Sequence, residues 1–183
     1  ACNAPIYQLY QLGVEIEENS ELDLFESFNA HDGDLRIASV VTDMEKELGD
    51  GNKKPEILAK LAQYELTLLD WIESHKGSKK YVAIAGKCWP AFQTQFGFVP
   101  CYVNSRLTGR GTPVSCEVDI YGALSEYIGT CVSEDAVTLL DINNSVPADM
   151  FKQDIDGKFN YTNKDTFMGF HCGNTVSYTH LRA

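Results

Sequence analysis

The fold of this chain is decided by Pro113-Val114-Ser115-Cys116-Glu117-Val118-Asp119-Ile120-Tyr121-Gly122-Ala123-Leu124. This stretch passes from a short apolar strand into a helix, with Glu117 at the junction and Asp119 as a candidate N-cap. A second apolar run, Ala136 to Leu140, ends at Asp141, 24 residues after Glu117. An acid at the end of a buried strand costs free energy unless water, a cation or a hydrogen-bond donor meets it. The two acids therefore predict one site, for a hard divalent cation or for paired acid–base chemistry.

Strand-like and helix-like segments alternate along the rest of the chain. The apolar patterns predict strands over 13–18, 81–85, 114–116 and 136–142, and helices over 4–12, 34–48, 55–74 and 119–132. A short helix is expected to follow Trp89 and end near Phe96. This alternation predicts an α/β fold, a parallel-sheet layer with helices on its faces. Ligands bind at the carboxyl ends of strands in such sheets, where Lys87, Glu117 and Asp141 are expected to lie.

The pattern changes after Pro147. Asp156-Gly157 stands between apolar–polar alternations and predicts a hairpin over 151–161, and 166–170 reads as a further strand. We expect an α/β domain over 1–147 and the start of a smaller β-rich region over 148–175. Residues 176–183 show no clear period and are interpreted as a non-native tail.

Composition excludes several classes of protein. The net charge is −11, with 26 acidic against 15 basic residues. The sequence contains no basic patch, which argues against a nucleic-acid partner. None of the six cysteines forms a Cys-x-x-Cys pair, and their spacing does not resemble a disulfide framework, so a cytoplasmic setting is expected. No apolar run approaches the roughly 18 residues of a membrane span.

Four ordered segments carry a resemblance to a known family: Lys87-Cys88-Trp89-Pro90, Ser115 to Asp119, Leu140 to Asn143, and Gly169 to Thr175. In residues and spacing they resemble the L-fucose/L-arabinose isomerase family, and the interval from Glu117 to Asp141 matches its L-fucose branch. The resemblance extends from about residue 4 to about residue 175 and is densest over 81–142. It implies a metal-dependent enzyme that interconverts an aldose and its ketose through an enediol, with Mn²⁺ as the usual metal and a monosaccharide as substrate. It also implies a homo-oligomer, and because family members are much longer, an internal fragment that is inactive alone.

The resemblance assigns roles to particular residues. It makes Glu117 and Asp141 metal ligands, one or both of which also move the proton. His171 is either a third ligand or a hydrogen-bonded core histidine; family members bring a further histidine ligand from near their C-terminus. Trp89 either floors the sugar pocket or packs in the core. Lys87 either contacts a substrate hydroxyl or is an ordinary exposed loop lysine.

Two further expectations complete the sequence reading. His31 and His75 lie in polar segments and are expected to be plain surface residues. The competing function is a non-catalytic sugar-binding or regulatory α/β protein, which would need neither Glu117 nor Asp141.

Overall fold

The computed structural model describes residues 5–135, 137–144 and 146–171 of the 183-residue chain. The α-helices are α1 Tyr7–Gln11, α2 Glu21–Ala30, α3 Ile37–Leu48, α4 Leu58–His75, α5 Cys101–Gly109, α6 Ile120–Ser133 and α7 Ala148–Asp154. The strands are β1 Ile84–Ala85, β2 Val114–Ser115, β3 Asp141–Asn143 and β4 Met168–Phe170. Short 3₁₀ turns are η1 Gly49–Gly51, η2 Pro55–Ile57 and η4 Asn163–Asp165, and a π-helical turn, η3, covers Phe92–Phe96.

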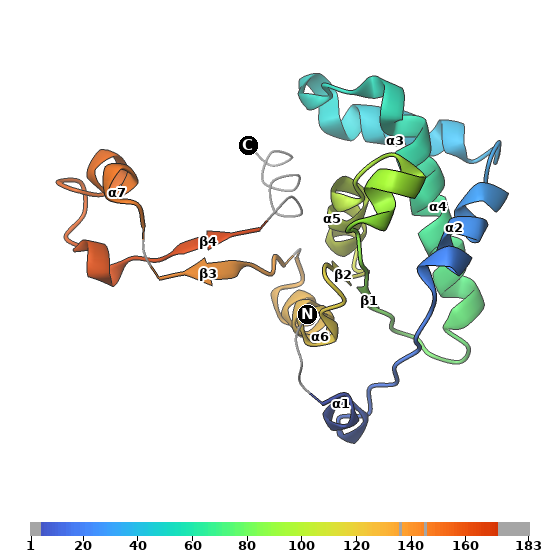
Figure 1. Cartoon of the computed structure of the whole chain (residues 1–183), viewed down its shortest axis with the longest axis horizontal. Helices are drawn as coiled ribbons and strands as arrows, with labels where there is room; N and C mark the ends of the chain where they lie inside the picture. Colours follow the sequence, from blue (N-terminus) through green and yellow to red (C-terminus); the bar gives the residue numbers. More distant parts are fainter. Residues whose placement is uncertain (1–4, 136, 145, 172–183) are drawn as a thin grey trace.

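The hydrophobic core forms around the first three turns of α4. Helices α2, α3 and α5 pack about this helix, and β1, β2 and α6 lie beside them (Figure 1). The buried apolar side chains come from these elements and from the segment after β1: Phe28, Met44, Leu58, Leu61, Ala62, Tyr64, Leu68, Phe92, Phe96, Phe98, Val103, Leu107 and Val114. Tyr64 meets Phe92 edge to face, with ring centroids 5.2 Å apart, and Phe92 stacks on Phe96. Burial of these side chains is the main source of stability.

Two small sheets confirm the α/β fold. Strands β1 and β2 are parallel, with Ile84 opposite Val114 and Ala85 opposite Ser115. Strands β3 and β4 form a separate antiparallel pair, which extends with α7 as an arm from the rest of the molecule (Figure 1). The predicted helices over 4–12, 34–48, 55–74 and 119–132 correspond to α1, α3, η2 with α4, and α6. None of the described helices has both the length and the apolar character of a membrane span.

Three predicted β segments are wrong in whole or in part. Residues 14–18 form no strand, because their alternating pattern has no neighbouring strand to complete a hydrogen-bonded ladder in the described part of the chain. The segment 151–161 is not a hairpin: α7 occupies its first residues and a turn follows. Residues 137–140 lie outside the sheets, and only Asp141 to Asn143 are in a strand.

Three α-helices, α2, α5 and α7, were not predicted from the sequence. Part of α7 was interpreted as a hairpin, and the other two were missed for different reasons. Helix α2 carries an ordinary start signal, since the Ser20 side chain accepts a hydrogen bond from the Leu22 backbone N–H and two acids follow in the first turn. Helix α5 shows no apolar stripe because polar side chains, among them Asn104 and Arg106, occupy its buried face. The predicted tail, 176–183, lies outside the described residues.

Candidate functional site

Glu117 and Lys87 stand at neighbouring carboxyl ends of the parallel strands. The Gly86 backbone N–H donates to the Ser115 carbonyl at 2.9 Å, and the Val118 N–H donates to the Gly86 carbonyl at 3.1 Å. The second bond links Gly86, directly before Lys87, to Val118, directly after Glu117. Both side chains are exposed, as a residue that meets a ligand requires. The structure therefore brings together these two predicted site residues.

The backbone at Glu117 is strained. Glu117 has φ 60° and Val118 has φ 56°, although neither is glycine. Side-chain-bearing residues in this left-handed region cost of order 1–3 kcal/mol each and cluster at ligand sites, where the surrounding structure holds them in place. Here the turn is held by Asp119, whose side chain accepts from the Gly122 N–H at 2.8 Å and whose carbonyl accepts from the Ser115 hydroxyl at 2.8 Å. Asp119 is thus the N-cap of α6, as the sequence predicts.

The segment before Asp141 follows a path that the sequence did not reveal. After α6 the chain turns back along the helix, where Val137 packs over Gly129 and Leu139 packs over Gly122. A Cβ atom at position 122 would lie 2.5 Å from Leu139 Cδ2. Leu139 can therefore pack this close to α6 only because residue 122 is a glycine. The segment before Asp141 therefore runs back along α6, from Gly129 to Gly122.

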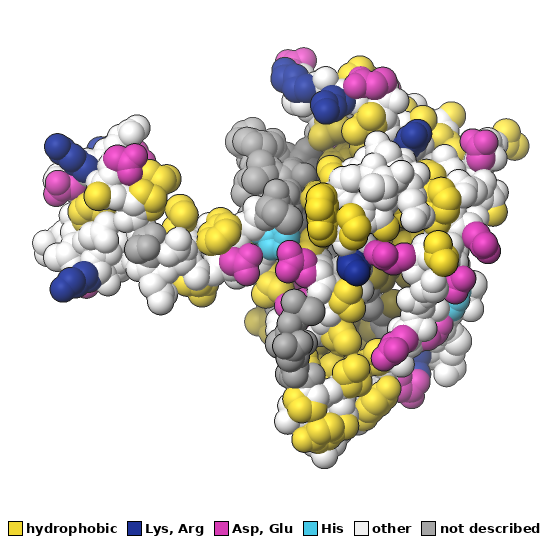
Figure 2. Space-filling model, in the orientation of Figure 1, with side chains coloured by type: hydrophobic (Ala, Val, Ile, Leu, Met, Phe, Trp, Pro, Cys, Tyr) yellow, Lys and Arg dark blue, Asp and Glu magenta, His cyan; other side chains and the backbone are white. Residues whose placement is uncertain are grey.

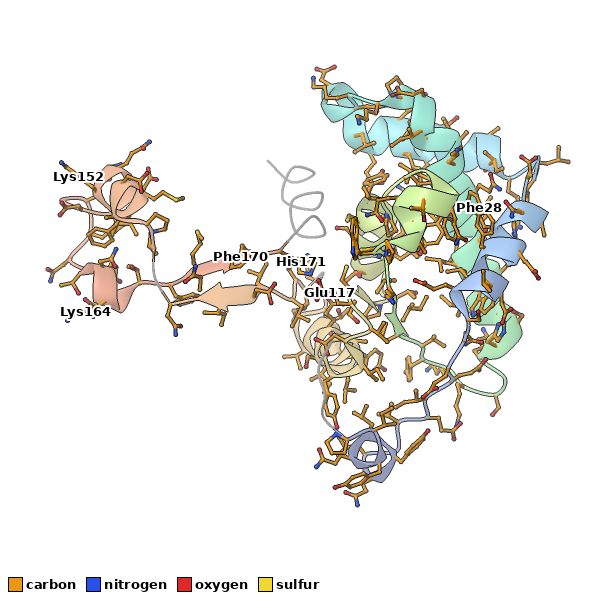
Figure 3. The ribbon with its side chains drawn as sticks, viewed as in Figure 1. Phe28, Glu117, Lys152, Lys164, Phe170 and His171 are labelled. Carbon is orange, nitrogen blue, oxygen red and sulfur yellow. The ribbon has the colours of Figure 1, made fainter. Side chains whose placement is uncertain are left out.

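His171 is the residue directly after β4, at the end of the β3–β4 pair where β3 begins. In the antiparallel pair Asp141 lies opposite Phe170, so His171 comes directly after the partner of Asp141. Figure 3 labels Glu117 and His171 close together in projection where the arm joins the body, and Figure 2 shows a histidine beside acidic side chains there. The strand register places Asp141 and His171 at the same end of the β3–β4 pair. The prediction that Asp141 ends a parallel strand is wrong, because α6 rather than β2 guides the segment before it.

Trp89 is not a core residue. Its side chain is 68 % exposed, which contradicts the alternative of core packing under the next helix. An exposed indole close to Lys87 in the chain is available to a ligand, and the role of a sugar-pocket floor stays a prediction.

The residue types predicted for the site are donors of a kind that metal ions accept, since carboxylates suit Mn²⁺ and imidazole binds transition metals. Glu117 and Asp141 are exposed. However, the ligand atoms of Glu117, Asp141 and His171 do not form a group within 4.8 Å of one another, so these three described residues make no preformed metal site in this structure.

A different cluster meets a purely geometric criterion for a metal site. Within the described residues, the ligand atoms of His31, Asp34 and Asp70 alone form a group of three that lie within 4.8 Å of one another. However, Arg36 already supplies the positive charge that a cation would bring. Its Nη2 donates a hydrogen bond to Asp34 Oδ2 and another to Asp70 Oδ2, each at 2.6 Å. We read this cluster as an ion-pair network between the end of α2 and α4.

His31 is a structural part of this network and not a plain surface residue. Its Nδ1 lies 2.8 Å from the Ser27 carbonyl and its Nε2 lies 2.9 Å from Asp70 Oδ2, so both ring nitrogens face acceptors. Burial lowers the pKa of His31, but these two hydrogen bonds and the nearby carboxylates outweigh it and raise the pKa above 6.5. His75 is exposed, as the sequence predicts, and its ring stacks on Trp71.

Glu126 is a buried acid that the sequence reading missed. It lies on the face of α6 that the returning segment covers, is 3 % exposed, and accepts a hydrogen bond from the Leu139 backbone. Its Oε2 is buried without a hydrogen-bond partner. Burial raises its pKa from 4.5 to about 7, with a smaller contribution from the charge of Asp119. The hydrogen bond from Leu139 to Glu126 thus holds the segment before Asp141 against α6.

We expect Glu126→Gln to remove part of the pH dependence of stability. A carboxyl whose pKa is raised in the folded state stabilises the protein fully below its ordinary pKa of 4.5 and loses that contribution as the pH rises through about 7. The melting temperature of the wild type should therefore fall more than that of Glu126→Gln between about pH 5 and about pH 8. Thermal melts followed by circular dichroism measure this. Glu45→Gln on the exposed face of α3 is the control, and parallel curves for wild type and Glu126→Gln would contradict the expectation.

Comparison with known proteins points to sugar isomerases. The chain is 36 % identical over 84 residues to the sulfoquinovose isomerase of Priestia aryabhattai, across 46 % of this chain and 18 % of that protein. It is 37 % identical over 70 residues to the sulfoquinovose isomerase of Clostridium sp. (strain MSTE9), across 35 % and 16 %. With the sulfoquinovose isomerase of Alkalicoccus urumqiensis the identity is 31 % over 109 residues, across 58 % and 24 %.

These similarities cover about a fifth of each curated relative's length. They support a sugar isomerase family and do not single out the L-fucose or L-arabinose isomerases. The chain matches no protein-family profile and no solved structure.

Proposed function

We propose that this chain is a segment of a metal-dependent aldose–ketose sugar isomerase. The observation that carries the proposal is the strained turn at Glu117, which holds an exposed acid just after β2. The similarity to sulfoquinovose isomerases supports the same reaction class. Glu117 and Asp141, together with His171, would hold Mn²⁺.

The chemistry assigned to the protein is a proton transfer between two carbons. Aldose-to-ketose conversion breaks the C2–H bond, forms a C1–H bond and moves the hydroxyl proton from O2 to O1. A bound divalent cation would supply Lewis-acid polarisation of the sugar oxygens. Glu117 and Asp141 are the groups that would take the proton from C2 and return it to C1. Lys87 and Trp89 would contact a hydroxyl and a C–H face of the sugar.

Sulfoquinovose is the first substrate to test, because it is the substrate in the names of the similar proteins. The full-length protein should be incubated with Mn²⁺ and, in separate reactions, sulfoquinovose, L-fucose or L-arabinose, and the ketose followed by NMR. Formation of a ketose that stops on chelation supports the proposal. Binding of a sugar without conversion would instead favour the non-catalytic sugar-binding alternative, and neither binding nor conversion would refute both.

His171→Ala should weaken Mn²⁺ binding by the full-length protein by roughly 10–100-fold or more, a range already seen when only the partner of a ligand is lost. The physical reason is the loss of an imidazole donor beside the two carboxylates. Isothermal titration of the folded variant with Mn²⁺ measures the affinity. A variant with lower thermal stability and unchanged Mn²⁺ affinity would show that His171 is a structural residue.

A further inference from the structure

A pocket opens between α2, α4, α5 and β1, next to the ends of the parallel strands. Its volume is about 230 Å³, and it reaches from Glu21 and Asn104 to Gly86 and Lys87. Apolar side chains form much of its wall: Leu24, Tyr64, Leu68 and Phe92. The pocket therefore has room for a small molecule.

Two polar groups in its wall lack partners. Asn104 is only 3 % exposed, and its Oδ1 is buried without a hydrogen bond. Glu21 Oε1 is also buried without one. A buried acceptor without a partner costs free energy, and folded proteins satisfy the great majority of such groups with protein, water or ligand. Both groups line this pocket, so a molecule inside it can satisfy them.

The chemistry of these groups selects the kind of molecule. The Asn104 amide offers donors and an acceptor on one side chain, whereas an ionised Glu21 offers acceptors only. A hydroxyl group both donates and accepts, so neighbouring hydroxyls can serve the two residues at once. The rings of Tyr64 and Phe92 suit the C–H groups between the hydroxyls. A purely apolar molecule would leave Asn104 and Glu21 unsatisfied.

We propose that this pocket binds a small polyol, with Asn104 and Glu21 as its hydrogen-bonding residues. Binding needs neither a metal ion nor Asp141, so the site is additional to the proposed isomerase function. Its opening beside Lys87 sets it next to Glu117, and a ligand there would be a neighbour of the candidate metal site.

The test uses the 183-residue chain in the presence of EDTA, with xylitol and glycerol as probes and 1-pentanol as an apolar comparison. Saturation-transfer NMR and calorimetric titration should show saturable binding of xylitol that exceeds binding of 1-pentanol. Asn104→Leu, which keeps the size and removes the hydrogen bonds, should lower xylitol affinity at least tenfold. Asn160→Leu, at an exposed loop position, is the matched control and should bind like the wild type.

Two further variants make the result decisive. Glu21→Met should also weaken xylitol binding, and it tests the site independently if Asn104→Leu does not fold. Glu117→Gln should bind xylitol like the wild type, which separates this site from the proposed metal site. Absence of saturable xylitol binding by the wild type, or equal binding by wild type and folded Asn104→Leu, would show that the pocket holds only water and overturn the proposal.

Discussion

Glu117→Gln in the full-length protein should abolish isomerisation and leave the fold intact. Glutamine keeps the shape of the side chain but has neither the charge that holds a cation nor the basicity that moves a proton. Because Glu117 is exposed, the substitution removes no buried contact, and stability should not change. Steady-state rates of ketose formation with Mn²⁺ measure kcat, and thermal melts check the fold.

The control for this experiment is Glu56→Gln, an exposed acid at the start of η2 and distant in sequence from the site. It should retain wild-type kcat. If Glu117→Gln kept more than about a tenth of wild-type kcat, a loss below roughly 1.4 kcal/mol, the catalytic assignment would fail.

Arg106→Met should lower the free energy of unfolding by about 3–5 kcal/mol, the usual cost of leaving a buried charge without its partner. Arg106 is 3 % exposed on α5, and its Nε donates to Glu65 Oε2 at 2.7 Å. Its two Nη groups donate to Asp43 and Glu47 of α3. Glu65, on α4, is itself only 2 % exposed. Without Arg106 it would keep only its 3.4 Å contact with Arg110. Urea unfolding of the 183-residue chain measures the loss.

Two comparison variants isolate the cause. Arg36→Met removes an arginine with two carboxylate partners at the surface, where solvent screens the charges, and should cost much less. Arg106→Met combined with Glu65→Leu removes both buried charges and should recover part of the loss. Equal losses for Arg36→Met and Arg106→Met would mean that burial of the network does not matter.

Much of the architecture could be predicted because its signals are local. The apolar stripe of α4 and the cap at Asp119 are contained in short stretches of sequence, and both occur in the structure. The parallel pairing of β1 with β2 follows from two short apolar runs separated by helices. The position of Glu117 at the junction of β2 and α6 was predictable for the same reason.

Features that depend on distant partners could not be predicted in this way. Helix α5 reads as polar because its buried Arg106 is satisfied by acids from two other helices. The run before Asp141 reads as a strand because it is short and apolar, yet Gly122 and Gly129 allow it to pack on α6 instead. Glu126, beneath that run, carries no sequence signal that distinguishes it from a solvent-exposed glutamate.

The sequence by itself determined the residue types of the candidate site and the α/β class, because periodicity, caps and the interval from Glu117 to Asp141 are properties of the chain alone. Only the tertiary structure decided how these residues meet. The sequence does not show whether a carboxylate or an amide is solvated or buried. The free energy of such a group depends on the neighbours that packing provides. Packing lays the segment before Asp141 along α6, exposes Trp89, and leaves Asn104 without a partner in the wall of a pocket.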